Sequence, residues 1–377
     1  MTKLRSSVTI QHCLKNTQRP ECRENFCCRR IAFTEELGYG DLTHRSVYTP
    51  NTVKPSPRFI CVAGFLIAAL AVVHIGRLTL FAQSPTVRTI ALTFDDLPYL
   101  AVEPAEYVRN AERVTDEILR VLRVHNAPAV AFVNEARLQV PGEIDARVAV
   151  LKRWSDAGVV LGNHTYSHAD FNSLSVPEFE DEIIHGEVVT RRLMEARRPY
   201  QLYFRFPETH GGDTAEKKQA VEAFLAERGY KVTPHTIENQ DFVFNVLYVK
   251  AQRSGDAAGS ARLASTYLDF TFAATAFAEQ IAPKVFGRDI PQTLLIHAND
   301  ITADCLDKLL AGFETRGYRF VTLDEAMSDD AYQTHDTLVT KAGPTWLWRW
   351  MKSKGMKVSF NADPEPPAWV SDMYSKH

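Results

Sequence analysis

The stretch ALTFDDLPYL, residues 91–100, ends an apolar run with two adjacent carboxylates, Asp95 and Asp96. Neighbouring side chains on a strand face opposite sides of the sheet, so a strand cannot present both acids to one site while this alternation holds. Where a strand ends, the backbone turns and both side chains can reach the same rim. The pair therefore indicates a functional site at a strand end, provided that other strands bring polar residues to the same place.

From residue 86 onward, short apolar runs alternate with amphipathic stretches. We expect strands over 88–94, 128–134, 158–164, 203–207, 230–233, 242–248, 292–298 and 318–323. We expect helices over 104–125, 144–158, 177–196, 214–228, 259–283 and 303–317. Strands that alternate with helices predict an α/β fold with a parallel sheet, and a length of roughly 250 residues suits a closed or nearly closed barrel. A doubly wound open sheet is the alternative, but FDDLPYL lacks the glycine fingerprint of a dinucleotide site.

Charge and hydropathy set the first 83 residues apart from the rest. Residues 1–58 carry ten Lys and Arg against five Asp and Glu, a net charge of +5, so the chain's total of -3 leaves -8 for the remainder. An acidic body predicts that nucleic acid is not a partner. Residues 1–58 are interpreted as a polar N-terminal extension, or as the product of a start site placed too early. Only Cys305 follows the apolar run described next, so the body cannot form an internal disulfide.

Residues 59–75, FICVAGFLIAALAVVHI, contain no Asp, Glu, Lys or Arg. This length is at the short edge of a membrane-spanning helix, and the basic residues before it direct the following chain outward. We expect 59–83 to be a cleaved signal peptide or a membrane anchor, with a buried core helix as the less favoured alternative. The predicted location is extracytoplasmic, either periplasmic or secreted, or membrane-anchored through 59–75 with the catalytic domain outside.

Polar residues stand at the ends of most expected strands. They are Asp95 and Asp96, His164 and His168 in NHTYSH, Arg205 before Pro207, Asp241 at the start of the segment near 240, and His297. In parallel α/β folds, catalytic residues gather at the carboxyl ends of strands. Two neutral imidazoles and one carboxylate can bind a metal ion and leave positions open for water and substrate. The His164–His168 spacing of four would place both rings on one side of a helical turn.

Each of these features has an ordinary structural explanation when taken alone. A pair of aspartates often caps a turn, two histidines four residues apart arise by chance, and a histidine on an apolar strand usually belongs to the core. An isolated arginine is usually a surface or ion-pair residue. The functional interpretation depends on their recurrence at strand ends, in one order along the chain.

In that order, the sequence resembles the polysaccharide deacetylases of the NodB-like family, which are carbohydrate esterases. The resemblance covers about residues 86 to 325 and rests on TFDD (93–96), HTYSH (164–168), RFP (205–207), QDF around Asp241, and LLIH (294–297). Phe242 departs from the family pattern, which usually has Trp there. The resemblance implies a distorted (β/α) barrel with seven strands as the catalytic domain, residues 86–330.

The same resemblance assigns roles by position. Asp96, His164 and His168 would bind a divalent metal, most often Zn²⁺ with Co²⁺ or Ni²⁺ as alternatives. Asp95 would be the general base, oriented by Arg205, and His297 the general acid, tuned by Asp241. Phe242 and Pro207 would contact the substrate, an N- or O-acetylated polysaccharide related to chitin, peptidoglycan or xylan.

Two other functions compete with a metal-dependent deacetylase: a metal-independent hydrolase of small amides on the same fold, and a non-catalytic glycan-binding protein of the cell wall. For the latter, residues 331–377 would supply a sugar-stacking platform through Trp346, Trp348, Trp350 and Trp369. We favour the simpler interpretation of this tail as an appendage that packs on the body. The sequence leaves the oligomeric state open.

Overall fold

The computed structural model describes residues 87–377, apart from 104, 198 and 360–361. The chain divides into two units, Met1–Ala82 and Gln83–His377, and the described residues belong to the second. The predicted N-terminal extension and the segment 59–83 lie outside the described residues. Within the described part of the chain, no helix combines the length and the hydropathy needed to cross a membrane.

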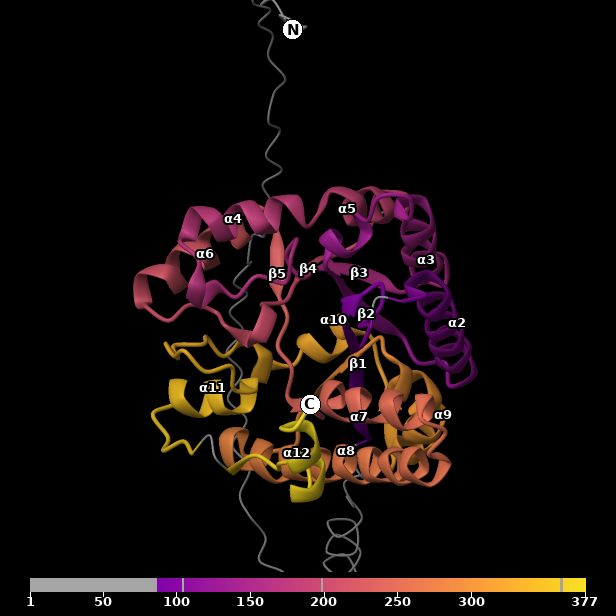
Figure 1. The fold of residues 1–377 in the computed structure, drawn as a ribbon. Helices are drawn as coiled ribbons and strands as arrows, with labels where there is room; N and C mark the ends of the chain where they lie inside the picture. The colour runs from indigo at the N-terminus through magenta and orange to yellow at the C-terminus, as the bar shows by residue number, and fades with distance from the viewer. Residues whose placement is uncertain (1–86, 104, 198, 360–361) are drawn as a thin grey trace, which may run out of the picture. The chain divides into compact units, whose positions relative to one another are not determined.

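One parallel sheet forms the centre of the second unit (Figure 1). Its strands are β1 (Arg88–Leu97), β2 (Ala129–Val133), β3 (Val160–Asn163), β4 (Leu202–Phe204), β5 (Tyr230–Val232), β6 (Ile237–Glu238), β7 (Gln292–His297) and β8 (Tyr318–Phe320). Seven of them follow the order β5-β4-β3-β2-β1-β7-β6, and β8 pairs with the start of β1. Every ladder is parallel, as expected for strands joined by helices.

The two edge strands of this order, β5 and β6, are halves of one extended segment. Four residues, 233–236, join them, so their ends lie within about 17 Å of each other. The Thr233 amide still donates to the carbonyl of Phe204 at the end of β4, whereas the Thr236 amide donates to the carbonyl of Thr293 in β7. The segment changes its partner from β4 to β7 and thereby curls the sheet round. The predicted distorted (β/α) barrel is confirmed, with seven strands along the main path.

Helices surround the sheet (Figure 1). They are α2 (Tyr107–Val124), α3 (Ile144–Asp156), α4 (Val176–His185), α5 (Val188–Glu195), α6 (Ala215–Glu227), α7 (Asp241–Arg253), α8 (Ala257–Phe286), α9 (Asp300–Thr315), α10 (Leu323–Met327), α11 (Trp346–Ser353) and α12 (Ala368–Tyr374). The long helix expected over 177–196 is two helices, since Gly186 ends α4 and α5 starts at Val188.

One expected strand is wrong. Residues 242–248, rich in aromatic and β-branched residues, belong to helix α7 rather than to a strand. Its buried residues include Val243, Phe244, Leu247 and Tyr248, which is helical spacing, and they pack against α8, α9 and α12. The strand that pairs with β7 lies earlier, at β6. Asp241 therefore follows a strand and opens a helix.

The floor of the barrel beneath its carboxyl end is formed by Phe132. Its ring lies 4.4 Å from the guanidinium carbon of Arg205 and 6.3 Å from the ring of His164. Gly162 on the neighbouring strand leaves room for it, since a Cβ at that position would stand 2.7 Å from the ring. The absence of a side chain at Gly162 therefore allows the Phe132 ring to lie next to Arg205 and His164.

The C-terminal appendage packs on the body. Trp346, Trp348 and Trp350 are buried, and Trp346 and Trp350 contribute to the same core as β1. Arg349, also buried, pairs with Asp336 at 3.0 Å and donates to the carbonyl of Thr209, in the loop after β4. The favoured interpretation of the tail agrees with this packing, and the three buried tryptophans cannot serve as a sugar platform. Trp369 is partly buried beneath the guanidinium of Arg262.

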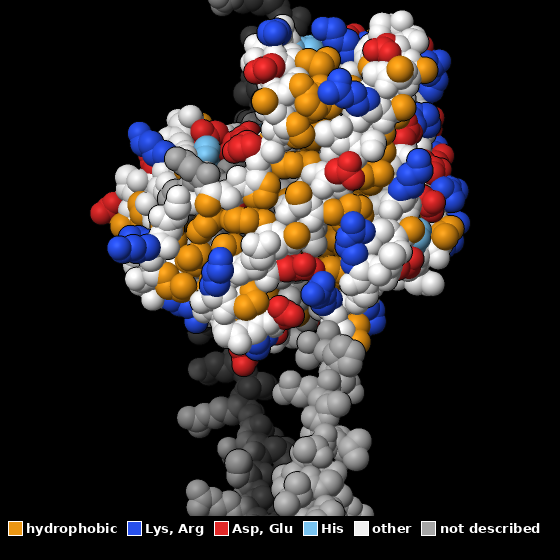
Figure 2. Space-filling model, turned by 90° about the horizontal axis from the view of Figure 1, so that it is seen from below, with side chains coloured by type: hydrophobic (Ala, Val, Ile, Leu, Met, Phe, Trp, Pro, Cys, Tyr) orange, Lys and Arg blue, Asp and Glu red, His pale blue; other side chains and the backbone are white. Residues whose placement is uncertain are grey.

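The face seen from the side of α8, which runs along the lower edge of Figure 1, carries charges of both signs (Figure 2). Lys and Arg side chains are interspersed there with Asp and Glu, and apolar side chains are spread across the middle of the view. On this face, the described residues form no broad patch of a single sign.

We expect Gly162→Ala to lower the free energy of unfolding by about 1–3 kcal/mol, because its Cβ would overlap the Phe132 ring and approach the carbonyl of Tyr203 at 3.1 Å. Gly211→Ala is the matched control, since the nearest neighbours of its Cβ would lie 3.9 Å away. Urea denaturation of both variants measures the difference. Equal stability of the two would show that Phe132 moves freely.

Candidate active site

The adjacent carboxylates reach one rim because the backbone changes conformation between them. Asp95 is still in register with His297 on β7, so the two residues lie side by side on neighbouring strands. Asp96 has a left-handed φ of 64°, and the pairing of β1 with β2 shifts register between Phe94 and Leu97. Aspartate tolerates this conformation better than most residues. The irregularity turns the side chain of Asp96 toward the site that Asp95 already faces.

Asp95 forms a buried ion pair with Arg205. The Arg205 Nη1 donates to the Asp95 Oδ1 at 2.7 Å and to the hydroxyl of Thr93 at 2.8 Å. Arg205 is 1% exposed and Asp95 is 2% exposed, so neither charge is solvated and each depends on the other. The second carboxylate oxygen of Asp95, Oδ2, points elsewhere and lies 3.8 Å from the Nε2 of His164.

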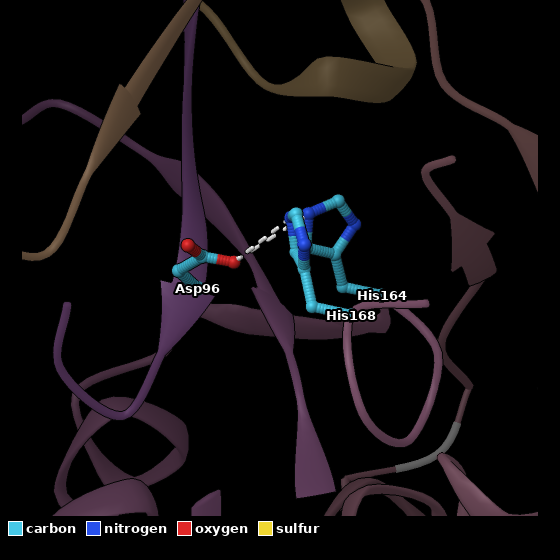
Figure 3. Close-up of side chains that lie close together, drawn as sticks. All are labelled: Asp96, His164 and His168. Carbon is cyan, nitrogen blue, oxygen red and sulfur yellow. Dashed lines mark ion pairs between the residues drawn. The ribbon is translucent and has the colours of Figure 1, made fainter. Parts of the chain in front are cut away.

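Asp96, His164 and His168 converge on one point (Figure 3). The Asp96 Oδ1 lies 3.7 Å from the Nε2 of His164 and 3.5 Å from the Nε2 of His168. The ligand atoms of the three residues all lie within 4.8 Å of one another. Two imidazole nitrogens and one carboxylate oxygen are a donor set that suits zinc and similar divalent cations.

The hydrogen bonds around Asp96 and His164 show which of their atoms present a lone pair to the site. The Nδ1 of His164 lies 2.9 Å from the carbonyl oxygen of Arg205, which can only accept, so Nδ1 carries the hydrogen and Nε2 presents a lone pair. Burial lowers the pKa of His164 to about 4, against the nearby Asp95 carboxylate, so the ring is neutral near pH 7. The Asp96 Oδ1 is buried without a hydrogen-bond partner. Lone pairs that face each other in this way fit a bound cation.

The reason given for the histidine spacing is wrong, although the two residues do meet. Residues 164–168 form no helix, and both Thr165 and His168 have left-handed φ angles, of 65° and 63°. This loop, rather than a helical turn, brings the two rings to a centroid distance of 5.0 Å. Asn163 supports it, because its side chain accepts from the Thr165 amide and donates to the carbonyl of Ile183.

His297 and Asp241 form a second charged pair beside the first. The Nδ1 of His297 lies 2.6 Å from the Asp241 Oδ1, and the His297 amide donates to the Oδ2 at 2.7 Å. Thr302 and Asn299 also donate to this oxygen. Burial by itself would lower the pKa of His297, but the Asp241 carboxylate outweighs it and raises the pKa to about 10. His297 is therefore protonated at neutral pH, with its Nε2–H available to a ligand.

The two predicted substrate contacts flank these pairs. Phe242, the first residue after Asp241, lies with its ring centroid 6.0 Å from that of His297, edge to face. Pro207 is buried and opens the short helical turn Pro207–Thr209 after Arg205. The structure thus brings the predicted metal ligands and both charged pairs to the carboxyl end of the barrel, with Phe242 next to His297. Their catalytic and binding roles remain predictions.

Some residues of this region were not anticipated from the sequence. Arg137 follows β2 and pairs with Asp96, the Nη2–Oδ2 distance being 3.2 Å. Glu238, at the end of β6, has a pKa raised by burial to about 7, and its Oε2 lies 3.9 Å from the Nε2 of the fully buried His235. Glu238 stands at a strand end, the signal that identifies the other site residues, but the sequence pattern places that strand too late, at 242–248. Arg137 lies three residues beyond the expected strand 128–134, inside a short 3₁₀ helix.

The comparisons with known proteins agree with one another: the matching family model and the similar proteins are all described as deacetylases. Residues 82–224 match the family model described as polysaccharide deacetylase. A chitin deacetylase of Arthroderma benhamiae is 30% identical over 164 residues, which cover 44% of this chain and 38% of that protein. A peptidoglycan-N-acetylglucosamine deacetylase of Bacillus cereus is 24% identical over 246 residues, covering 62% of this chain and 66% of that protein.

In both cases the match spans less than two thirds of the relative's length. Among solved structures, the chitin deacetylase of Colletotrichum lindemuthianum aligns with a TM-score of 0.42 and 21% identity, covering 64% of this chain and 88% of that one. The family resemblance expected from the motifs is confirmed by the family model and the sequence relatives.

We expect Asp241→Asn to lower the pKa of His297 from about 10 to below its ordinary value of about 6.5, because the burial that opposes the charge would remain without the carboxylate. Histidine NMR titration of the metal-free protein measures this. Asp307→Asn, which removes a carboxylate next to His125, is the control and should leave the His297 curve in place. An unchanged curve in Asp241→Asn would contradict the assignment.

The same pair predicts a pH dependence of stability. Because folding raises the pKa of His297, its contribution is fully present below about pH 6.5 and is lost as the pH rises through about 10. Asp241 behaves in the opposite sense, since its lowered pKa gives stability that disappears as the pH falls through the folded value. Thermal unfolding from pH 6 to 10 should show a smaller decline in Asp241→Asn than in the native protein.

Proposed function

We propose that this chain is a hydrolase that removes acetyl groups from an acetylated glycan, because residues 82–224 match the polysaccharide deacetylase family model. The observation that carries the proposal is the meeting of a paired carboxylate, a protonated histidine and a three-residue cation site at one end of the barrel. The named relatives act on chitin or peptidoglycan N-acetylglucosamine, which favours an N-acetylated amino-sugar polymer over an O-acetylated one such as xylan.

Asp96, His164 and His168 would hold the divalent metal, which we take to be Zn²⁺, with Co²⁺ or Ni²⁺ able to replace it. Once bound there, the metal would polarise the acetyl carbonyl and lower the pKa of water. His164 is prepared for this role, because its hydrogen bond to the carbonyl of Arg205 fixes the ring with its Nε2 toward the site.

Asp95 would act as the general base. Its Oδ1 is held by Arg205, which leaves the Oδ2 to accept the proton of the attacking water. Arg205 itself is a positioning residue, since its Nη1 contacts only Asp95 and Thr93. The ion pair with Arg205 holds Asp95 beside the cation site through Oδ1 and leaves Oδ2 free for proton transfer.

His297 would act as the general acid. Because the Asp241 carboxylate keeps it protonated, its Nε2–H can donate to the leaving amine or alkoxide as the bond to the acetyl carbon breaks. Asp95 and His297 are register partners on adjacent strands, so the proton acceptor and the proton donor flank the same point. Phe242, edge to face with His297, would form part of the wall that receives the acetyl methyl, and Pro207 would line the far side.

We also propose that the enzyme works outside the cytoplasm, as a periplasmic, secreted or membrane-anchored protein. The apolar run 59–75 and the basic residues before it support this location. Residues 86–330 would form the catalytic domain. The appendage 331–377 would complete it, since Trp346, Trp348 and Trp350 belong to the core shared with β1.

The function is tested by measuring acetate release from N-acetylated chitin oligomers, peptidoglycan and acetylxylan. We expect release from an N-acetylated glycan, loss of it on chelation, and recovery when Zn²⁺ or Co²⁺ is added back. Activity that survives with no metal bound would favour a metal-independent amide hydrolase. Glycan binding without acetate release from any substrate would favour a non-catalytic glycan-binding protein.

Asp95→Asn should bind metal normally but lower the rate of acetate release by about 10²–10⁴-fold, because the proton acceptor is lost while the ligands remain. The matched control is Asp269→Asn, on the exposed face of α8, which should retain full activity. Metal content and acetate release are measured on the same preparations. An active Asp95→Asn enzyme would show that another group takes the proton.

A further inference from the structure

Arg137 contacts the predicted metal ligand Asp96 from the side away from the histidines. It lies in the short 3₁₀ helix η1 (Glu135–Leu138) that follows β2, and its Nη2 is 3.2 Å from the Asp96 Oδ2. The other oxygen, Oδ1, faces His164 and His168. Each carboxylate oxygen thus has its own direction, one toward the guanidinium and one toward the cation site.

The position of Arg137 is fixed by the loops that carry the ligands. Its Nε donates to the side-chain oxygen of Asn134 at 3.4 Å, and the Asn134 amide group donates to the carbonyl of His164. The Ala136 amide donates to the carbonyl of Tyr166 at 2.9 Å. Any movement of the His164 loop would therefore be transmitted to Arg137, and the guanidinium is part of the site rather than a passing surface charge.

The charges around the site explain what this contact does. Of the three ligands, only the Asp96 carboxylate would bring a formal negative charge to a bound cation, because imidazole coordinates through a neutral nitrogen lone pair. The Arg137 guanidinium pairs with that carboxylate, its Nη2 lying 3.2 Å from the Asp96 Oδ2. When the Arg137 guanidinium is counted together with the Asp96 carboxylate, the two side chains have a net charge of about zero beside a bound metal ion.

We propose that Arg137 is a positioning residue that restricts Asp96 to one coordinating oxygen and draws charge away from it, so that the bound metal is held less tightly and keeps more of its positive charge. This proposal rests on the metal site of the proposed function. Its consequence for metal binding can be measured whether or not the enzyme releases acetate.

The direction in which metal affinity changes when Arg137 is removed distinguishes this role from simple orientation of a ligand. Residues that orient a metal ligand usually support affinity, and their loss weakens binding by about 10–100-fold. A cation that draws charge from the ligand has the opposite effect. We therefore expect Arg137→Gln to bind Zn²⁺ about tenfold more tightly than the native protein, as removal of one unit charge beside a divalent cation implies.

The experiment measures the Zn²⁺ dissociation constant by chelator competition in the native protein, Arg137→Gln, Arg137→Met and Arg137→Lys. Tighter binding in the Gln and Met variants, with affinity close to native in the Lys variant, is the expected result, because Lys retains the charge as a point cation. Arg288→Gln is the matched control. It removes the same charge from an exposed ion pair with Asp329, near the start of β1 and far from Asp96 along that strand.

Cobalt substitution gives a second readout. If Asp96 coordinates through both oxygens once Arg137 is removed, the coordination number rises and the visible absorption of bound Co²⁺ becomes weaker in Arg137→Gln. Weaker Zn²⁺ binding in Arg137→Gln, or affinity and spectrum that do not change, would overturn the proposal. Failure of the native enzyme to release acetate would overturn the proposed function and leave these measurements standing.

Discussion

A guanidinium that is almost fully buried inside a barrel must have an anionic partner, and the pairing of Arg205 with Asp95 is the constraint on which the rest of the site depends. Arg205 follows β4, whereas Asp95 belongs to β1, three positions away in the order of strands. Only a curled sheet allows this contact. The carbonyl of Arg205 also fixes the orientation of His164, so one residue ties the proposed base to a proposed metal ligand.

The same pair explains the packing beneath it. The guanidinium carbon of Arg205 lies over the Phe132 ring, and Phe132 occupies the space that Gly162 leaves open. Replacing the charge pair by apolar residues would suit stability at least as well, by the usual energetics of buried ions. Its presence is better explained by what it does to Asp95, which keeps one oxygen bound and the other directed at the cation site.

Much of this arrangement could be predicted from the sequence because it depends on local patterns. Apolar runs bounded by turns located most strands, and the polar residues after them located the charged pairs. The pattern failed where tertiary packing decides the outcome. FVFNVLY, at 242–248, has the composition of a strand, but burial against α8 and α9 makes it helical. The left-handed conformations of Asp96 and His168 have no signature in composition, so the means by which the ligands meet could not be foreseen.

Local sequence patterns also could not predict which strands pair when they are far apart in the sequence. Nothing in the residues 230–238 shows that the segment changes its partner from β4 to β7, although that change closes the barrel. Glu238 could not be predicted for this reason. Arg137 lies inside the short 3₁₀ helix that follows β2, so a search for polar residues directly at strand ends passes it over.

The central place of β1 has a consequence for how the protein is made. Its neighbour along one edge, β7, is synthesised about 200 residues after it, as the bond from Thr93 to Leu294 shows, and β8, which pairs with its start, later still. Until then, β1 presents an unpaired edge of backbone donors and acceptors, which is a template for aggregation. Contacts of such sequence separation also slow folding. A nascent chain that ends near residue 224 therefore holds most of the residues proposed for catalysis, together with an unpaired β1 edge that could associate with other copies of the chain.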